Sequence, residues 1–303
     1  MRSGYIILAL VLFTGMQIYL CGCNQKLNNT KQQLRQFWES RSYDNVFSLS
    51  QSALETEPLD YFLLTIHGFS AYQLGISQIN KSDTMRYIDQ CVLSLRKAIL
   101  LKEASSDKLI WRVYYVLGKA YFEKGEDHMD LAITYLEKAR ELKDAVRDNP
   151  DDGKDIPEYL GLAYAASGDY RSSVEAFSQA LSPLNATPSD LLLLSIARSY
   201  VELNEPETAK AYLMHCLEIS KDSKTIVTVR FLLAEIYNKA GNFEGAKNQL
   251  SAIIDSMGDN SEAYYQLGEL YAQRGDIAQA RAQWRLSLKT DPANQKARTR
   301  LGQ

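Results

Sequence analysis

Two cysteines near the amino terminus are the first residues whose type and spacing suggest chemistry. Cys21 and Cys23 stand two positions apart, directly after an apolar stretch. Two thiolates could take part in a metal site, but tetrahedral zinc requires four ligands, and the sequence around this pair supplies no further Cys or His. With 4 cysteines in 303 residues, the chain is also no disulfide scaffold. The pair could instead mark a point where the chain is cut and tethered.

Residues 1–22 have the composition of a secretory signal peptide. Arg2 gives a short positive start, and an uncharged, largely apolar core follows over residues 5–20. A transmembrane helix needs about 20 apolar residues, so this core is short for a membrane span. The alternative to a cleaved signal is an uncleaved signal anchor whose cysteines have no role.

The residues at the end of this core resemble the lipobox of bacterial envelope lipoproteins. They read LCGC, residues 20–23, with Cys21 where such motifs usually carry Ala, Ser, Thr or Val. The resemblance implies cleavage after Gly22 and attachment of lipid to Cys23. Residues 23–30 would then form a short polar tether.

The rest of the chain repeats a pattern every 34 residues. Its clearest copy is 261–294, and similar copies cover 227–260, 190–223 and 154–187, with another starting at Trp111. The copies tend to have large residues at positions 7, 11 and 24 and small ones at 8, 20 and 27. The pattern is very similar to the tetratricopeptide repeat (TPR), a helix-turn-helix unit of that period.

This resemblance implies an all-α fold, a TPR-type α-solenoid in which antiparallel helix pairs stack into a superhelix. We expect two degenerate TPR-like units over residues 27–104, with an insertion around 76–88. Five TPR units and a C-terminal capping helix are expected over residues 111–303. The small residue at position 8, such as Gly268, lets two helix axes approach closely.

Motifs for catalysis or metal binding are not apparent in the repeats. The acidic segment 148–153 resembles a calcium loop only in part, because the residues at loop positions 3 and 12 are not ligands. The cluster at 125–130 could hold a cation weakly, but it is also an ordinary exposed acidic turn. The three histidines lie in different repeats. We therefore predict no enzyme, no catalytic residue, no metal and no cofactor.

Charge and cysteine placement fit an interaction protein. The formal net charge is −3, so the composition gives no basic footprint for nucleic acid. Cys91 and Cys216 occupy repeat positions 20 and 27, where a small core residue is expected. We predict that both are buried packing residues.

Partner binding is expected in the concave groove of the solenoid. In TPR domains, positions 2, 5, 9, 12 and 13 of the first helix of each unit tend to face that groove. A lining of aromatic and charged residues suits a protein or peptide partner with apolar anchors. The alternative is that some of these aromatics pack between repeats. The predicted groove comprises Tyr115, Lys119, Phe122, Arg198, Phe231, Glu235, Tyr265 and Glu269. We expect binding in the groove of the four C-terminal repeats, centred on Arg198, Phe231 and Tyr265.

Together these patterns predict a lipid-anchored TPR scaffold or assembly factor of the bacterial cell envelope. Asn24 follows the proposed lipid-bearing cysteine, where an Asp often favours the inner membrane. We therefore expect the outer membrane, on either its periplasmic face or the cell surface. The alternative functions are a surface-exposed adhesin and a ligand-binding or transport-associated subunit.

Overall fold

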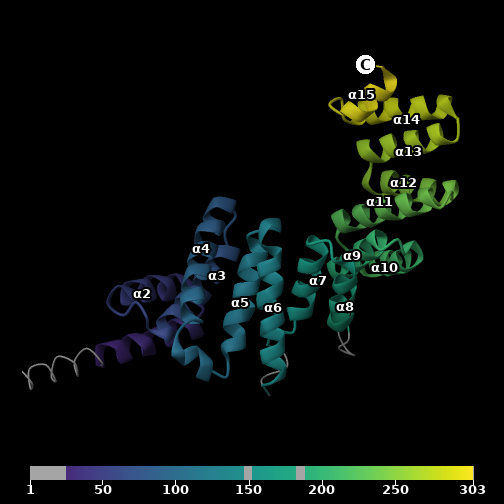
Figure 1. Ribbon diagram of the computed structural model, residues 1–303. Helices are drawn as coiled ribbons and strands as arrows, with labels where there is room; N and C mark the ends of the chain where they lie inside the picture. Colours follow the sequence, from purple (N-terminus) through teal and green to yellow (C-terminus); the bar gives the residue numbers. More distant parts are fainter. Residues whose placement is uncertain (1–24, 147–151, 182–187, 303) are drawn as a thin grey trace, which may run out of the picture. The chain divides into compact units, whose positions relative to one another are not determined.

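The computed structural model of the chain describes residues 25–146, 152–181 and 188–302 (Figure 1). Within these ranges the regular structure consists of α-helices and short 3-10 turns, without strands, which confirms the all-α prediction. None of the described helices combines the length and apolar composition needed to span a bilayer. The predicted signal peptide (1–22) and Cys23 lie outside the described residues.

The chain divides into two compact units, Met1–Ser167 and Gly168–Gln303. In the first unit, each α-helix from α2 to α6 packs on the next one along the chain, and α3 and α7 also contact α5. This is the arrangement expected when the first helices of successive repeats lie side by side. The elements of this unit are a helix over residues 25–39, α2 (Tyr43–Thr56), α3 (Tyr61–Ile76), α4 (Lys81–Ala98), η1 (Lys102–Ser106), α5 (Ile110–Glu123), η2 (Glu126–His128), α6 (Met129–Asp144) and α7 (Ile156–Ala166).

The second unit contains helices from Tyr170 to Leu301. Helices α9 and α10, α11 and α12, and α13 and α14 form successive pairs, and α15 packs on α14. The predicted copy 154–187 therefore has its first helix in one unit and its second helix in the other. The elements are α8 (Tyr170–Leu181), α9 (Asp190–Glu202), α10 (Pro206–Ile219), α11 (Ser223–Lys239), α12 (Phe243–Met257), α13 (Ser261–Gln273), α14 (Ile277–Thr290) and α15 (Gln295–Leu301).

Side-chain caps fix where most helices of the second unit begin. A backbone N–H in the first turn would otherwise lack a partner, and a preceding Ser, Asp or Asn oxygen accepts its hydrogen bond. Asp222, for example, accepts from the Thr225 N–H at 2.8 Å. The same role is taken by Ser189, Asn242, Asn260, Asp276 and Asn294.

Small residues allow the helices of a pair to pack closely. A Cβ added at Gly118 would lie 2.5 Å from Leu136 Cγ, so α5 and α6 meet where only a hydrogen fits. Cys91 and Cys216 are fully buried in these cores, as predicted. Burial raises the pKa of the Cys216 thiol to about 11, so this thiol stays protonated at neutral pH.

Two details of the first unit differ from the sequence prediction. Residues 25–30, assigned to the tether, are helical, because Leu27 packs against the cluster around Leu34 and Val46 while its polar neighbours face outward. The expected insertion at 76–88 is mostly helix. Helix α4 begins at Lys81, and its extra turns extend a helix that buries Ile88.

Candidate functional site

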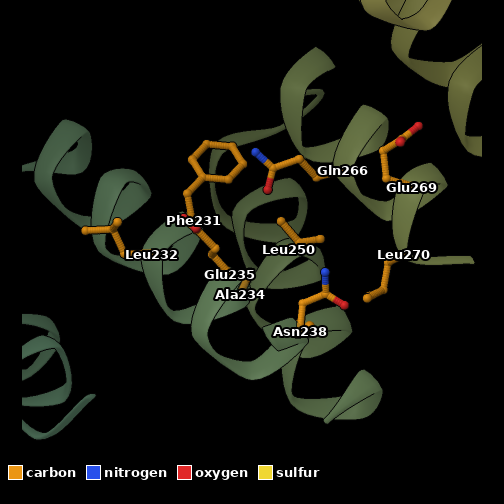
Figure 2. Close-up of a pocket in the computed structure, with 10 residues that line it drawn as sticks. Phe231, Leu232, Ala234, Glu235, Asn238, Leu250, Gln266, Glu269 and Leu270 are labelled. Carbon is orange, nitrogen blue, oxygen red and sulfur yellow. The ribbon is translucent and has the colours of Figure 1, made fainter. Parts of the chain in front are cut away.

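A pocket of about 290 Å³ opens between α11, α12 and α13 (Figure 2). Its floor is apolar and buried: Ala246, Leu250 and Leu270 are each less than 5% exposed. Its rim carries polar and aromatic side chains from the two first helices, α11 and α13. The lining residues are Phe231, Leu232, Ala234, Glu235, Asn238, Ala246, Leu250, Gln266, Glu269 and Leu270.

Phe231 has two roles at this pocket. It is half-buried and packs against the apolar cluster shared by α11, α12 and α13. It also lines the pocket, into which Figure 2 shows its ring and the Gln266 amide projecting from facing helices. Truncating Phe231 would therefore remove both stability and contact area for a ligand.

The two rim carboxylates already have basic partners. Glu235 forms an ion pair with Lys239 at 2.7 Å, one turn further along α11. Glu269 accepts from Arg300 of α15 through both oxygens, at 2.8 Å from Nε and 2.5 Å from Nη2. This two-point contact fixes the orientation of the Glu269 carboxylate. The rim is thus charged but locally balanced.

Asn238 supplies hydrogen-bonding capacity that nothing in the described part of the chain uses. Its side-chain amide makes no hydrogen bond to any described residue, whereas Gln266 Nε2 donates to Glu262 at 3.0 Å. A primary amide offers two donors and an acceptor. Asn238 could therefore bind the backbone of a peptide lying in the pocket.

The structure does not bring the three central groove residues together at this pocket. Only Phe231 lines it. Tyr265 packs against the buried cluster of Ala280 and Trp284, and the Lys296 ammonium lies 5.5 Å from its ring centroid. Arg198 is exposed on α9. The position of Tyr265 therefore agrees with the alternative, in which an aromatic at a groove position packs between helices.

The predicted residues of the first unit form a different, largely internal cluster. The Tyr115 hydroxyl donates to both oxygens of Asp155, at 2.6 and 2.7 Å. Lys119 Nζ lies 3.2 Å from Asp155 Oδ2 and 4.4 Å from the ring centroid of Tyr159. The Phe122 ring meets Tyr159 edge-on, with the centroids 5.5 Å apart. Because Lys119 is only 14% exposed, this cluster ties α5 to α7 rather than offering a free cation.

Burial also changes the pKa of two carboxyl groups near Lys119. Burial raises the pKa of Glu123, and the positive charge of Lys119 partly opposes this. Burial, and then the charge of Asp155, raise the pKa of Glu158. Across the described residues, no group of three or more His, Cys, Asp or Glu is placed to hold a metal ion.

Sequence reasoning missed several residues of the α11–α13 pocket. Leu232 and Gln266 stand at repeat position 6, and Leu270 at position 10, each next to an expected groove position. Ala246 and Leu250 come from a second helix, which we did not expect to contribute. If the positions next to each groove position had been included, the sequence would have predicted the pocket residues on α11 and α13.

The described helices stack in successive pairs, which defines an α-helical solenoid. Residues 159–301 match the family model of the tetratricopeptide repeat-like domain, and residues 112–145 match that of the tetratricopeptide repeat. Both stretches of the chain therefore contain tetratricopeptide repeats, which are generally a non-catalytic protein-interaction fold.

Solved structures agree with this assignment of the fold. The C-terminal part of a TPR repeat-containing protein from Cytophaga hutchinsonii aligns with a TM-score of 0.64 and 16% identity, over 89% of this chain and 99% of that one. PilF of Pseudomonas aeruginosa aligns at 0.53 and 14%, over 78% and 96%. YrrB, described as a TPR protein with an unusual peptide-binding site, aligns at 0.50 and 18%, over 69% and 98%. Comparison with curated proteins gives no significant match.

Proposed function

We propose that the protein is a lipid-anchored scaffold of the bacterial cell envelope that holds a peptide segment of a partner protein in the α11–α13 pocket. The observation that carries this proposal is the pocket itself. It combines a buried apolar floor, a half-exposed aromatic edge at Phe231 and an amide at Asn238 without a described partner. An apolar anchor could enter the floor while its backbone bonds to Asn238.

The fold supports this reading because tetratricopeptide repeats bind protein or peptide partners. YrrB, which shares the fold, is described as having a peptide-binding site. In an interface, most of the binding free energy comes from a few aromatic and arginine anchors seated in well-packed pockets. Phe231 is the residue of this pocket that best fits such a role.

The proposed anchor rests on the sequence LCGC at residues 20–23. Residue 25 is already helical, so a lipid on Cys23 would leave a very short link to the first helix. At about 3.5 Å per residue, such a link would hold the first repeat at the membrane surface. Protease treatment of intact cells separates a scaffold facing the periplasm from an adhesin on the cell surface, because only the adhesin is degraded.

Site-specific photocrosslinking in cells that make the protein tests partner binding. The photoreactive amino acid p-benzoylphenylalanine replaces Phe231, which preserves an aromatic ring at the pocket. A control variant carries it in place of Asn248, which is exposed on α12 and does not line the pocket. We expect one dominant protein adduct from position 231 that is missing from position 248. Identical adducts, or none from position 231, would place the partner elsewhere.

A further inference from the structure

A second pocket lies in the first unit, among residues that the sequence prediction did not include. It has a volume of about 310 Å³ and is bounded by the helix over residues 25–39, α3 and α5. Its walls are aromatic, formed by Trp38, Phe62 and Phe69, and all three rings are only partly buried. The volume is at the small end of ligand pockets, roughly 300–1,000 Å³, and suits one or two large side chains.

These residues occupy the repeat positions that face the groove in TPR domains. Counted from residue 61, Phe62 and Phe69 stand at positions 2 and 9 of their unit. Counted from residue 27, Trp38 stands at position 12. The first helices of two successive units therefore present aromatic side chains to one surface, and α5 adds Arg112. The weaker repeat pattern over residues 27–104 concealed this from sequence reasoning.

The charges at the rim of this pocket are not equivalent. Arg112 forms an ion pair with Asp152 at 2.5 Å, so its charge is already matched. Arg35 is exposed, and its guanidinium lies 5.0 Å from the ring centroid of Phe62. Within the described residues, Arg35 pairs with no carboxylate. Glu39, one turn further on, also lines the pocket and is exposed.

The contact with Phe62 matters for what Arg35 can bind. The guanidinium is a rigid plane of N–H donors that can meet a carboxylate at two points, and a contact with an aromatic ring limits how far it moves. Arg35 is thus partly oriented along an aromatic wall before any ligand arrives. Apolar surface and an oriented cation occur together at the same pocket wall.

We infer that this pocket binds a partner segment in which a large apolar side chain lies beside an aspartate or glutamate. The apolar side chain enters between Trp38, Phe62 and Phe69, and the carboxylate pairs with Arg35 at the rim. This site is independent of the α11–α13 pocket. It gives the scaffold a second docking point with its own chemical preference.

Selection from a phage library of random nonapeptides, using the full-length protein as bait, tests this inference. We expect enriched peptides to carry Leu, Ile, Phe or Trp within two positions of Asp or Glu. The variant Arg35→Glu should shift the preference toward Lys and Arg. Arg281→Glu is the matched control, because Arg281 is exposed on α14 in the other unit and should leave the selection unchanged.

Affinities of the most enriched peptide give the quantitative result. Arg35→Gln should weaken its binding roughly ten- to hundredfold, as expected for loss of a charge-assisted hydrogen bond. Glu39→Gln should strengthen it, because a like charge is removed from the rim. Circular dichroism should show that both variants keep the helicity and melting temperature of the parent. Enriched peptides without acids, a selection unaffected by Arg35→Glu, or binding abolished by Phe231→Ala instead would overturn the inference.

Discussion

Replacing Gly268 by alanine should cause a clash whose size can be worked out from the packing of α13 on α14. The new Cβ would lie 2.3 Å from Trp284 Nε1 and 2.4 Å from its Cδ1, where ordinary contact begins at 3.4 Å. The indole would have to move by about 1 Å, yet Trp284 is 5% exposed in a close-packed cluster. Overpacking of this kind costs about 1–3 kcal/mol. The better helix propensity of alanine offsets about 1 kcal/mol of this destabilisation.

Neighbouring repeats suggest the compensating change. At the same two repeat positions, the chain pairs Ala234 with Leu250 in one buried cluster. It pairs Ala197 with Leu213 in another. In these two helix pairs of the second unit, alanine is thus accommodated opposite a leucine. In a Trp284→Leu background, Gly268→Ala should therefore be neutral or stabilising.

Urea unfolding of the four proteins in this double-mutant cycle, followed by circular dichroism, measures the coupling free energy. We expect Gly268→Ala to be less favourable by about 1–3 kcal/mol when residue 284 is Trp than when it is Leu. Equal effects in both backgrounds would refute the packing register assigned to α13 and α14.

Two further predictions concern the amino terminus and pH. Mass spectrometry of the mature protein should find a diacylglyceryl group on Cys23, and lipid on Cys21 or an intact Met1 would disprove the signal assignment. Burial lowers the pKa of His67, which packs beside Ser50. As pH falls, the unfolded chain therefore takes up the proton before the folded chain does. The free energy of unfolding of the first unit should keep its full value above about pH 6.5. Below that pH it should decrease by at most about 1.4 kcal/mol per pH unit. Urea titrations at pH 7 and 5.5 should show a smaller loss for His67→Phe than for the parent, and equal losses would exclude His67 as the cause.

The repeat period predicts the fold well because its signal is local and repeated. Each copy places a small residue opposite a large one, as at Gly118 and Leu136, and the structure buries both. The amino-terminal units were harder to place. The extra turns of α4 and the polar face of residues 25–30 hide a helical pattern, so the sequence alone predicts an insertion at the first and a tether at the second.

The candidate site was predictable only in part. A groove position specifies a direction from the helix axis, and it does not say whether a neighbouring helix fills the space there. Phe231 and Tyr265 share repeat position 5, yet Phe231 lines a pocket while Tyr265 packs against the cluster at α14 and α15. The difference depends on the helix that follows each repeat, which the repeat's own residues do not encode.

Binding of a partner in the α11–α13 pocket can be tested with a matched pair of phenylalanine truncations. Phe231 and Phe243 pack against the same buried cluster, but only Phe231 lines the pocket. Affinity for the partner captured by crosslinking should be measured for Phe231→Ala and Phe243→Ala, with melting temperatures of both. We expect similar losses of stability in both variants and at least about tenfold weaker binding for Phe231→Ala alone, since a hot-spot side chain contributes about 2 kcal/mol or more. Equal affinities in the two folded variants would contradict it.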